Sequence, residues 1–201
     1  KTRTLIEALD TLAAYIPVDI SEDHLLKTAE SLKVRYPSVE ILPLVTDFTV
    51  EFQLPRPSRP TSRVAVYFPG STIGNFLPSE ASRMLSLIAG LQGVNGSLLI
   101  GIDLQKDPSI IEAAYDDAEN VTAEFNLNLL HRINKELGGD FEVSQFRHHV
   151  KYDPENGRVE MYLTSLCDQT VDIQGRTFLF AAGEGVLTEY SHKYTIDGFT
   201  T

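Results

Sequence analysis

Apolar runs alternate with amphipathic helical segments along the first half of the chain. Apolar residues recur at helical spacing over 1–13, 21–32 and 78–92, and near-continuous apolar runs occupy 15–19, 39–45, 63–68 and 97–102. Strands of this kind between helices are typical of a parallel sheet that is covered on both faces. Residues 1–105 are therefore predicted to form an α/β, doubly wound (Rossmann-like) sheet, whose ligands bind beyond the carboxyl ends of the strands.

The pattern changes after residue 105. Residues 108–137 have helical spacing and end at a pair of glycines. Alternating segments follow at 141–152, 158–167 and 169–180, and the turn residues Asp153-Pro-Glu-Asn-Gly157 are a hairpin signal. We therefore predict an α+β insertion over residues 106–193 and a return to the core over 194–201.

Composition narrows the possible partners. The formal net charge of −11 disfavours a nucleic-acid partner, because phosphate binding requires clustered Lys and Arg. No apolar run reaches about 18 residues, so we expect no membrane association. The single cysteine, Cys167, excludes an internal disulfide and fits a reducing, cytoplasmic compartment. The five histidines lack the spacing of metal ligands, so we expect no metal site.

Both ends of the chain interrupt a pattern. The first helical segment begins at Lys1 with no strand before it, and the last residues, 197–201, stop where another helix is expected. We therefore expect an internal fragment of a longer protein.

Acidic residues follow two of the predicted strands. Asp19 can accept hydrogen bonds from both hydroxyls of a ribose, or it can cap the following helix. Asp47 can take an adenine amino group while Phe48 flanks the ring, or Asp47 can be an ordinary turn residue. Because both positions lie at the same predicted sheet edge, a nucleoside ligand is favoured. A methyltransferase and an NAD-dependent enzyme would both fit this pattern.

The loop after the strand 63–68 contains glycines, hydroxyls and an amide. Gly70 and Gly74 permit a close approach of the backbone to a ligand, and Asn75 ends the loop. Such a loop can hold a polar ligand, or it can simply turn the chain into the next helix.

Several strings, spread over nearly the whole chain, resemble one family. They are Phe68-Pro-Gly-Ser-Thr-Ile-Gly-Asn75, Gly101-Ile-Asp-Leu-Gln-Lys-Asp107, Ala114-Tyr-Asp-Asp-Ala118, Val121-Thr-Ala-Glu-Phe-Asn126, Asn134-Lys-Glu-Leu137, Arg158-Val-Glu-Met161 and Leu187-Thr-Glu-Tyr-Ser-His-Lys193. The chain thereby resembles the histidine-specific methyltransferases. The resemblance implies that S-adenosylmethionine (SAM) methylates the α-amino group of L-histidine to trimethylhistidine (hercynine), the first step towards ergothioneine.

The resemblance also implies roles for individual residues. On the donor side, Lys1 would lie near the methionine moiety of SAM, Asp19 would bind the ribose, and Asp47 and Phe48 would surround the adenine. Residues 1–105 would be a methyltransferase core without its first strand and glycine loop, and 106–193 would be a substrate-binding insertion. A fragment that lacks the glycine loop is expected to be inactive alone.

On the acceptor side, the resemblance assigns the substrate's carboxylate to Asn75 and Tyr115, near the backbone of Gly70. It assigns the imidazole to Glu189 and Ser191, with Tyr190 between them. Met161 would pack against the imidazole ring. No residue is assigned as a catalytic acid or base.

Three other interpretations stay open at this point. A methyltransferase of the same fold could act on another aromatic amino acid, although Glu189 argues for histidine. A nicotinamide-dependent oxidoreductase would also use Asp19, but it needs an upstream Gly-x-Gly-x-x-Gly and a hydride site. A non-catalytic binding domain would fit only a protein that naturally begins at Lys1.

Overall fold

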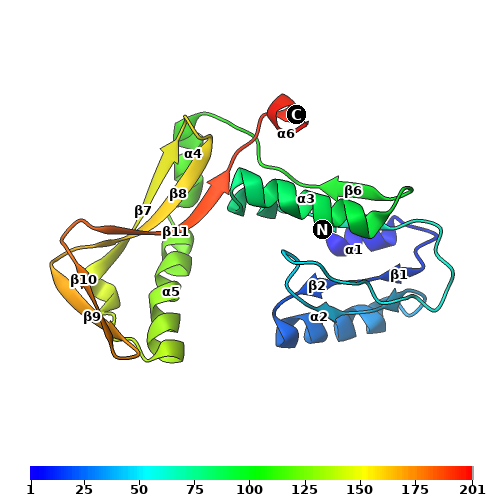
Figure 1. The fold of residues 1–201 in the computed structure, drawn as a ribbon, viewed down its shortest axis with the longest axis horizontal. Helices are drawn as coiled ribbons and strands as arrows, with labels where there is room; N and C mark the ends of the chain where they lie inside the picture. Colours follow the sequence, from blue (N-terminus) through cyan, green and yellow to red (C-terminus); the bar gives the residue numbers. More distant parts are fainter. Residues whose placement is uncertain (201) are drawn as a thin grey trace. The chain divides into compact units, whose positions relative to one another are not determined.

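A computed structural model describes residues 1–200, and the chain divides into two compact units (Figure 1). Unit 1 comprises Lys1–Phe68 and Pro78–Ile100, and unit 2 comprises Pro69–Leu77 and Gly101–Thr201. The glycine-containing loop 69–77 thus groups with the second half of the chain. The functional boundaries at 105/106 and 193/194 stay predictions.

Two pairs of short parallel strands form at the start of unit 1. β1 (Ala14–Tyr15) pairs with β3 (Glu40–Ile41), and β2 (Val18–Asp19) pairs with β4 (Leu44–Val45). Each predicted strand is split by a proline, Pro17 or Pro43, which has no N–H to donate to a ladder. Backbone hydrogen bonds of 2.9–3.0 Å, from Leu42 to Tyr15 and from Leu44 to Pro17, keep the pairing in register across the interruptions.

A third parallel pair belongs to a β–α–β crossover. β5 (Ala65–Phe68) pairs with β6 (Ser97–Ile100), and α3 (Pro78–Gln92) connects them. The helix has the predicted bounds 78–92, and Gly93, with a φ of 66°, follows its last turn. The parallel orientation that the apolar runs predicted is confirmed for all three pairs, whereas the doubly wound strand order stays a prediction.

Two further helices pack in unit 1. α1 (Thr2–Glu7) is shorter than the predicted helix 1–13, and α2 (Glu22–Arg35) extends beyond the predicted end at residue 32. The two helices share a core with β3, to which Ile6, Ala29, Leu32 and Ile41 contribute buried side chains. Thr2–Glu7 and Glu22–Arg35 thus cover the first strand pair.

Unit 2 contains the predicted α+β segment. An antiparallel sheet has the order β11-β8-β7, and a separate hairpin joins β9 to β10. The strands are β7 (Phe146–Asp153), β8 (Arg158–Ser165), β9 (Gln169–Ile173), β10 (Arg176–Phe180) and β11 (Gly185–His192). Short 3₁₀ turns lie at η1 (Thr72–Asn75) and η2 (Val143–Gln145), and α6 (Ile196–Thr200) closes the described chain.

The predicted helix 108–137 is two helices, α4 (Pro108–Tyr115) and α5 (Val121–Leu137). The break is local in origin. Asn120 adopts a left-handed φ of 58°, and the Asp117 carboxylate accepts the backbone N–H groups of Val121 and Thr122 at 2.9 Å each. These hydrogen bonds lower the pKa of Asp117 to about 2. A new helix, α5, therefore starts here, and α4 does not continue into it.

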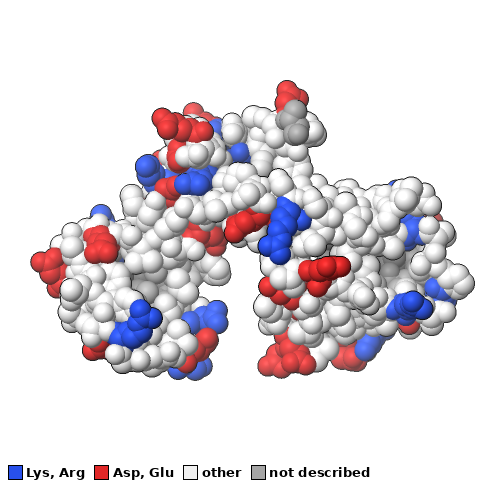
Figure 2. Space-filling view, in the orientation of Figure 1, with Lys and Arg blue, Asp and Glu red and all other residues white. Residues whose placement is uncertain are grey.

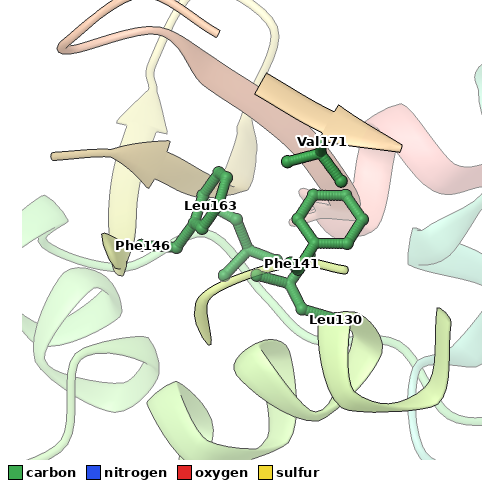
Figure 3. Packing of buried hydrophobic residues seen from close by; sticks show 5 residues of the cluster. All are labelled: Leu130, Phe141, Phe146, Leu163 and Val171. Carbon is green, nitrogen blue, oxygen red and sulfur yellow. The ribbon is translucent and has the colours of Figure 1, made fainter. Parts of the chain in front are cut away.

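The core of unit 2 forms where α5 faces the strands (Figure 3). Leu130, Phe141, Phe146, Leu163 and Val171 are buried together. The rings of Phe141 and Phe146 meet edge to face, with centroids 5.5 Å apart. Apolar burial from a helix, a hairpin and the sheet thus gives this unit its own core, independent of the parallel strands.

Charged side chains of both signs are interspersed over the face shown in Figure 2. Such mixing is typical of a solvated surface. None of the helices formed by residues 1–200 combines the length and apolar character that crossing a bilayer requires.

The buried position of Leu163 generates a stability prediction. Leu163 is 1% exposed, so we expect Leu163→Ala to lower the free energy of unfolding by about 2–5 kcal/mol. Leu179→Ala is the matched control, because Leu179 is 75% exposed on β10 and its truncation should change stability by about 0.5 kcal/mol or less. Urea unfolding of both variants would test this; equal losses would contradict the assigned core.

Candidate functional site

Strand β11 and its continuation carry the acceptor candidates of unit 2. Because side chains alternate along a strand, Glu189 and Ser191 share one face, while Tyr190 lies on the other. Lys193 follows at the next position of the first face. Met161 of β8 is directly opposite Glu189 in the strand register. The register shifts between Leu187 and Glu189, and a β-bulge of this kind re-aims the side chains that follow it.

Tyr115, at the end of α4, reaches the same face. Its hydroxyl lies 2.7 Å from the Ser191 hydroxyl. Its ring packs against the buried cluster that contains Met161 and Val159. The structure therefore brings together four of the predicted acceptor residues, namely Tyr115, Met161, Glu189 and Ser191. Tyr115 and Ser191 are 76 residues apart in the sequence.

A hydrogen-bonded histidine positions Tyr115. His148 on β7 bonds through Nε2 to the backbone carbonyl of Tyr115 at 2.9 Å, and its Nδ1 lies 2.9 Å from the Asn126 amide nitrogen. A carbonyl can only accept and an amide NH₂ can only donate, so in this pairing Nε2 donates and Nδ1 accepts. Asn126 itself is buried and also donates to the Tyr162 carbonyl.

The loop that carries Asn75 is anchored to the residues after Ser191. The His192 ring bonds through Nδ1 to the carbonyl of Gly74 at 2.9 Å, and the Tyr194 hydroxyl donates to that of Ile73 at 3.3 Å. Gly74 lies so close to His192 that a Cβ there would be 2.7 Å from the His192 carbonyl oxygen. Asn75 itself is exposed at the end of η1, as is Gly70 at the start of the loop.

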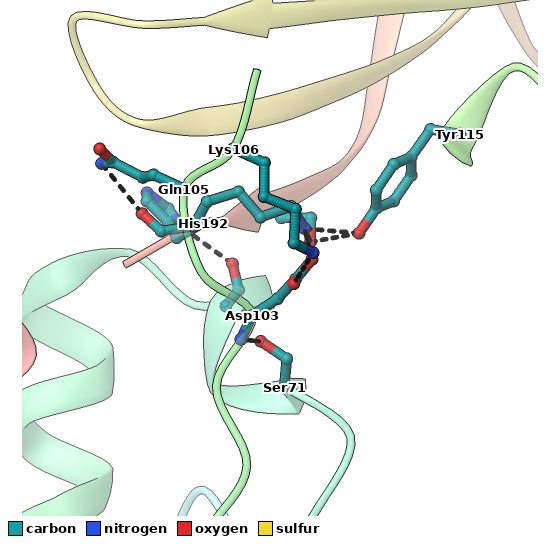
Figure 4. A network of polar contacts seen from close by, with 9 residues as sticks. Ser71, Asp103, Gln105, Lys106, Tyr115 and His192 are labelled. Carbon is teal, nitrogen blue, oxygen red and sulfur yellow. Dashed lines mark hydrogen bonds and ion pairs between the residues drawn. The ribbon is translucent and has the colours of Figure 1, made fainter. Parts of the chain in front are cut away.

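A buried cation, Lys193, contacts the hydroxyl pair. Figure 4 shows Asp103, Lys106 and Tyr115 within the same network of polar contacts. Lys193 Nζ is 2.7 Å from both the Tyr115 and the Ser191 hydroxyl oxygens, and 3.3 Å from a carboxylate oxygen of Asp103. Asp103 also pairs with Lys106 at 2.6 Å, and its backbone N–H donates to Ser71 at 2.8 Å. Burial acts to raise the pKa of Asp103, but Lys106 and Lys193 together hold it below its ordinary value.

Glu189 is the half-buried carboxylate of this face. Burial raises its pKa, because the low-dielectric surroundings disfavour the charged form, while the positive charge of Lys193 partly opposes this shift. A carboxylate in such surroundings gains most from a partner that donates an N–H to it.

Tyr190 has a different environment. The Arg158 guanidinium stacks over its ring at 4.0 Å from the centroid. Arg158 in turn pairs with the buried Glu160 at 2.6 Å. The structure thus places Tyr190 against this ion pair on the opposite face of β11, and its contact with substrate stays a prediction.

The donor-side candidates lie in unit 1. Asp19 ends β2 and Asp47 follows β4, and since these strands pair in parallel both carboxylates lie at one sheet edge. Each also has the turn role that the sequence left open: Asp19 accepts the Ser21 N–H at 2.8 Å, and Asp47 accepts the N–H and hydroxyl of Thr49.

The aromatic and basic donor candidates occupy different positions in unit 1. The Phe48 ring meets Phe68 edge to face, at 5.8 Å between centroids. Lys1 is exposed at the N-cap of α1. Their contacts with a nucleotide stay predictions.

Reasoning from the sequence missed the contributions of Lys193, Asp103 and His192. Lys193 and His192 lie within a string that carries the family resemblance, but nothing in the string indicated burial. The available signal was strand alternation, which puts Lys193 on the face of Glu189 and Ser191.

The chain is similar to proteins of one family over its whole length. Residues 1–201 match the family model described as histidine-specific methyltransferase, SAM-dependent. The histidine N-alpha-methyltransferases of Mycobacterium tuberculosis and Mycolicibacterium smegmatis are 38% and 37% identical, over 96% of this chain and 61% of each relative. Ergothioneine biosynthesis protein 1 of Schizosaccharomyces pombe is 27% identical over 96% of this chain and 26% of its own length. The chain thus spans 61% of the length of the two mycobacterial relatives.

The raised pKa of Glu189 predicts a pH-dependent stability difference from Glu189→Gln. The folded state holds its proton more tightly than the unfolded state, so ionisation destabilises the fold. Relative to the variant, the wild type should therefore lose stability as the pH rises from about 4.3, the ordinary value for Glu, through the raised pKa, and then level off. Urea unfolding between about pH 4 and 8 measures this difference.

Glu136→Gln is the control with the opposite sign. Arg132 holds the pKa of Glu136 below its ordinary value, so the wild type should gain stability relative to this variant as the pH rises. If the stability of the wild type relative to Glu189→Gln rose with pH, as expected relative to Glu136→Gln, the assigned environment of Glu189 would be contradicted.

Proposed function

The chain belongs to the histidine-specific, SAM-dependent methyltransferase family, and on that premise we propose that the full-length protein methylates the α-amino group of L-histidine. The product would be trimethylhistidine (hercynine), the first intermediate towards ergothioneine. The observation that carries the proposal is the cluster of Glu189, Ser191, Met161 and Tyr115 on one face of unit 2. The names of the mycobacterial relatives support the same substrate.

The imidazole is assigned to Glu189, Ser191 and Met161. The Glu189 carboxylate accepts the imidazole N–H, and the Ser191 hydroxyl bonds the other ring nitrogen. Met161, opposite Glu189 in the strand register, supplies an apolar and polarisable surface for the ring. A substrate without this N–H would leave a half-buried carboxylate unpaired, which is how polar pockets discriminate between similar ligands.

The carboxylate of the amino acid is assigned to Asn75 and Tyr115, beside the backbone of Gly70. Both side chains are uncharged donors, so neither places a strong acid next to the reacting amine. The anchored loop and the hydrogen-bonded end of α4 hold these two donors in place. Tyr190 is the last of the assigned acceptor residues, because it lies between Glu189 and Ser191 in the sequence.

The donor site is assigned to unit 1, whose sheet we infer to be doubly wound and Rossmann-like. SAM, when bound, supplies an electrophilic methyl group on a sulfonium. Two carboxylates at one edge of parallel strands suit a nucleoside: Asp19 for the ribose hydroxyls and Asp47 for the adenine amino group. Phe48 would flank the adenine, and Lys1 would lie near the methionine moiety.

The chemistry requires positioning more than acid–base catalysis. Methyl transfer from a sulfonium needs an uncharged amine whose lone pair is aligned with the S–CH₃ bond, and no oxyanion develops. Alignment of this kind can supply roughly 7–11 kcal/mol of the barrier. The residues assigned here therefore bind and orient, and none is assigned as a catalytic base.

Calorimetry on the full-length protein tests the substrate. With S-adenosylhomocysteine present, L-histidine and dimethylhistidine should bind, and L-tryptophan should bind far more weakly. Tight binding of tryptophan with no binding of histidine would contradict the proposal and favour a relative that acts on another aromatic amino acid.

Glu189→Ala tests the assignment of the imidazole. Loss of a hydrogen bond to a charged group should weaken histidine binding about 10- to 100-fold, with S-adenosylhomocysteine affinity unchanged. Glu136→Ala is the matched control, because Glu136 is an exposed glutamate on α5. A loss of S-adenosylhomocysteine binding in Glu189→Ala alone would place Glu189 outside the acceptor pocket.

A further inference from the structure

Lys193 is the most deeply buried cation of the acceptor face. Its side chain is 1% exposed. An ammonium group has three N–H donors, and Lys193 has three oxygen partners: the hydroxyls of Tyr115 and Ser191 at 2.7 Å and the Asp103 carboxylate at 3.3 Å. All three donors are therefore committed within the protein. A ligand cannot take one of them without displacing a partner.

The commitment of Lys193 constrains the two hydroxyls. Each hydroxyl oxygen accepts a hydrogen bond from the ammonium, and the two oxygens also bond each other at 2.7 Å. Without a ligand, one hydroxyl hydrogen is used in that mutual bond. If ligand acceptors replace the mutual bond, each oxygen has its own hydrogen to donate. Because both oxygens accept from a cation, both O–H groups are polarised and become stronger donors. The two hydroxyls therefore suit ligand groups that accept hydrogen bonds.

The Lys193 charge also contacts the aromatic part of Tyr115. Nζ lies 4.6 Å from the Tyr115 ring centroid. The same nitrogen that bonds the hydroxyl thus also lies within cation–π distance of the ring. Asp103, the carboxylate partner of Lys193, is itself held by the hydrogen bond from its backbone N–H to the Ser71 hydroxyl.

We propose that Lys193 is a positioning residue of the acceptor pocket, which holds the Tyr115 hydroxyl so that its hydrogen binds the substrate's carboxylate. The inference rests on the proposed function, because it takes an α-amino acid as the ligand. The acceptor nitrogen of the imidazole is already assigned to Ser191, so the carboxylate, which only accepts hydrogen bonds, is the group left for Tyr115. Lys193 thus acts on the carboxylate through the Tyr115 hydroxyl, without touching it.

A ligand pair separates this role from a merely structural one. Histidinol has the side chain and amine of histidine, but a CH₂OH group replaces the carboxylate. In the full-length protein with S-adenosylhomocysteine present, Lys193→Met should weaken L-histidine binding by about tenfold or more, and histidinol binding by less than about threefold. KM for histidine should rise more than kcat falls. Equal losses for both ligands, or no loss for histidine, would overturn the inference.

Lys106→Met is the matched control. Lys106 pairs with the same Asp103 carboxylate, but its side chain is 50% exposed. This variant should bind histidine and histidinol as the wild type does. A histidine-selective loss in Lys106→Met equal to that in Lys193→Met would show that the charge around Asp103, and not the hydroxyl contacts, is responsible, and would overturn the inference.

A second variant and a double-mutant cycle keep the test decisive if Lys193→Met weakens folding. If thermal unfolding shows that Lys193→Met is unfolded, Lys193→Gln takes its place, because glutamine keeps an N–H donor but has no charge. Combined with Tyr115→Phe, the Lys193 substitution should add little to the loss of histidine affinity that Tyr115→Phe causes alone. Fully additive losses would overturn the inference. Wild-type protein that fails to bind histidine would overturn the proposed function instead, whatever the variants do.

Discussion

The antiparallel pairing of β11 with β8 determines where the acceptor candidates lie. It sets Glu189 opposite Met161, and the same stretch of chain continues into His192 and Tyr194, which hold the loop that carries Asn75. Because side chains alternate along a strand, a slip of one residue would exchange the two faces of β11. The candidate site therefore depends first on backbone register, and only then on the identity of the side chains.

The buried ammonium group is the second constraint on this face. A charge removed from water is costly unless it is paired and fully hydrogen-bonded. Lys193 meets that condition through Asp103 and the hydroxyls of Tyr115 and Ser191. The same hydrogen bonds that make its burial tolerable also orient two polar side chains of the candidate site. Structural stability and the proposed ligand recognition thus rest on one set of contacts.

Local sequence pattern predicted the elements better than their ends. The helix 78–92 has its predicted bounds in α3, and the apolar runs pair in parallel as expected. The predicted helix 108–137 is interrupted because Asp117 caps a new helix after Asn120, which adopts a left-handed conformation. Periodicity averages over a window and does not register a single capping residue inside it.

The sequence by itself determined the mixed α/β class, the family, and the residue types available for an amino acid and a nucleoside. Only the tertiary structure decided that Tyr115 meets Ser191 and Lys193, which are 76 and 78 residues away along the chain. It also decided that Lys193 is buried. Contacts across such separations depend on strand register, the bulge in β11 and the anchoring of the loop, because these together fix the positions of side chains that no local pattern relates.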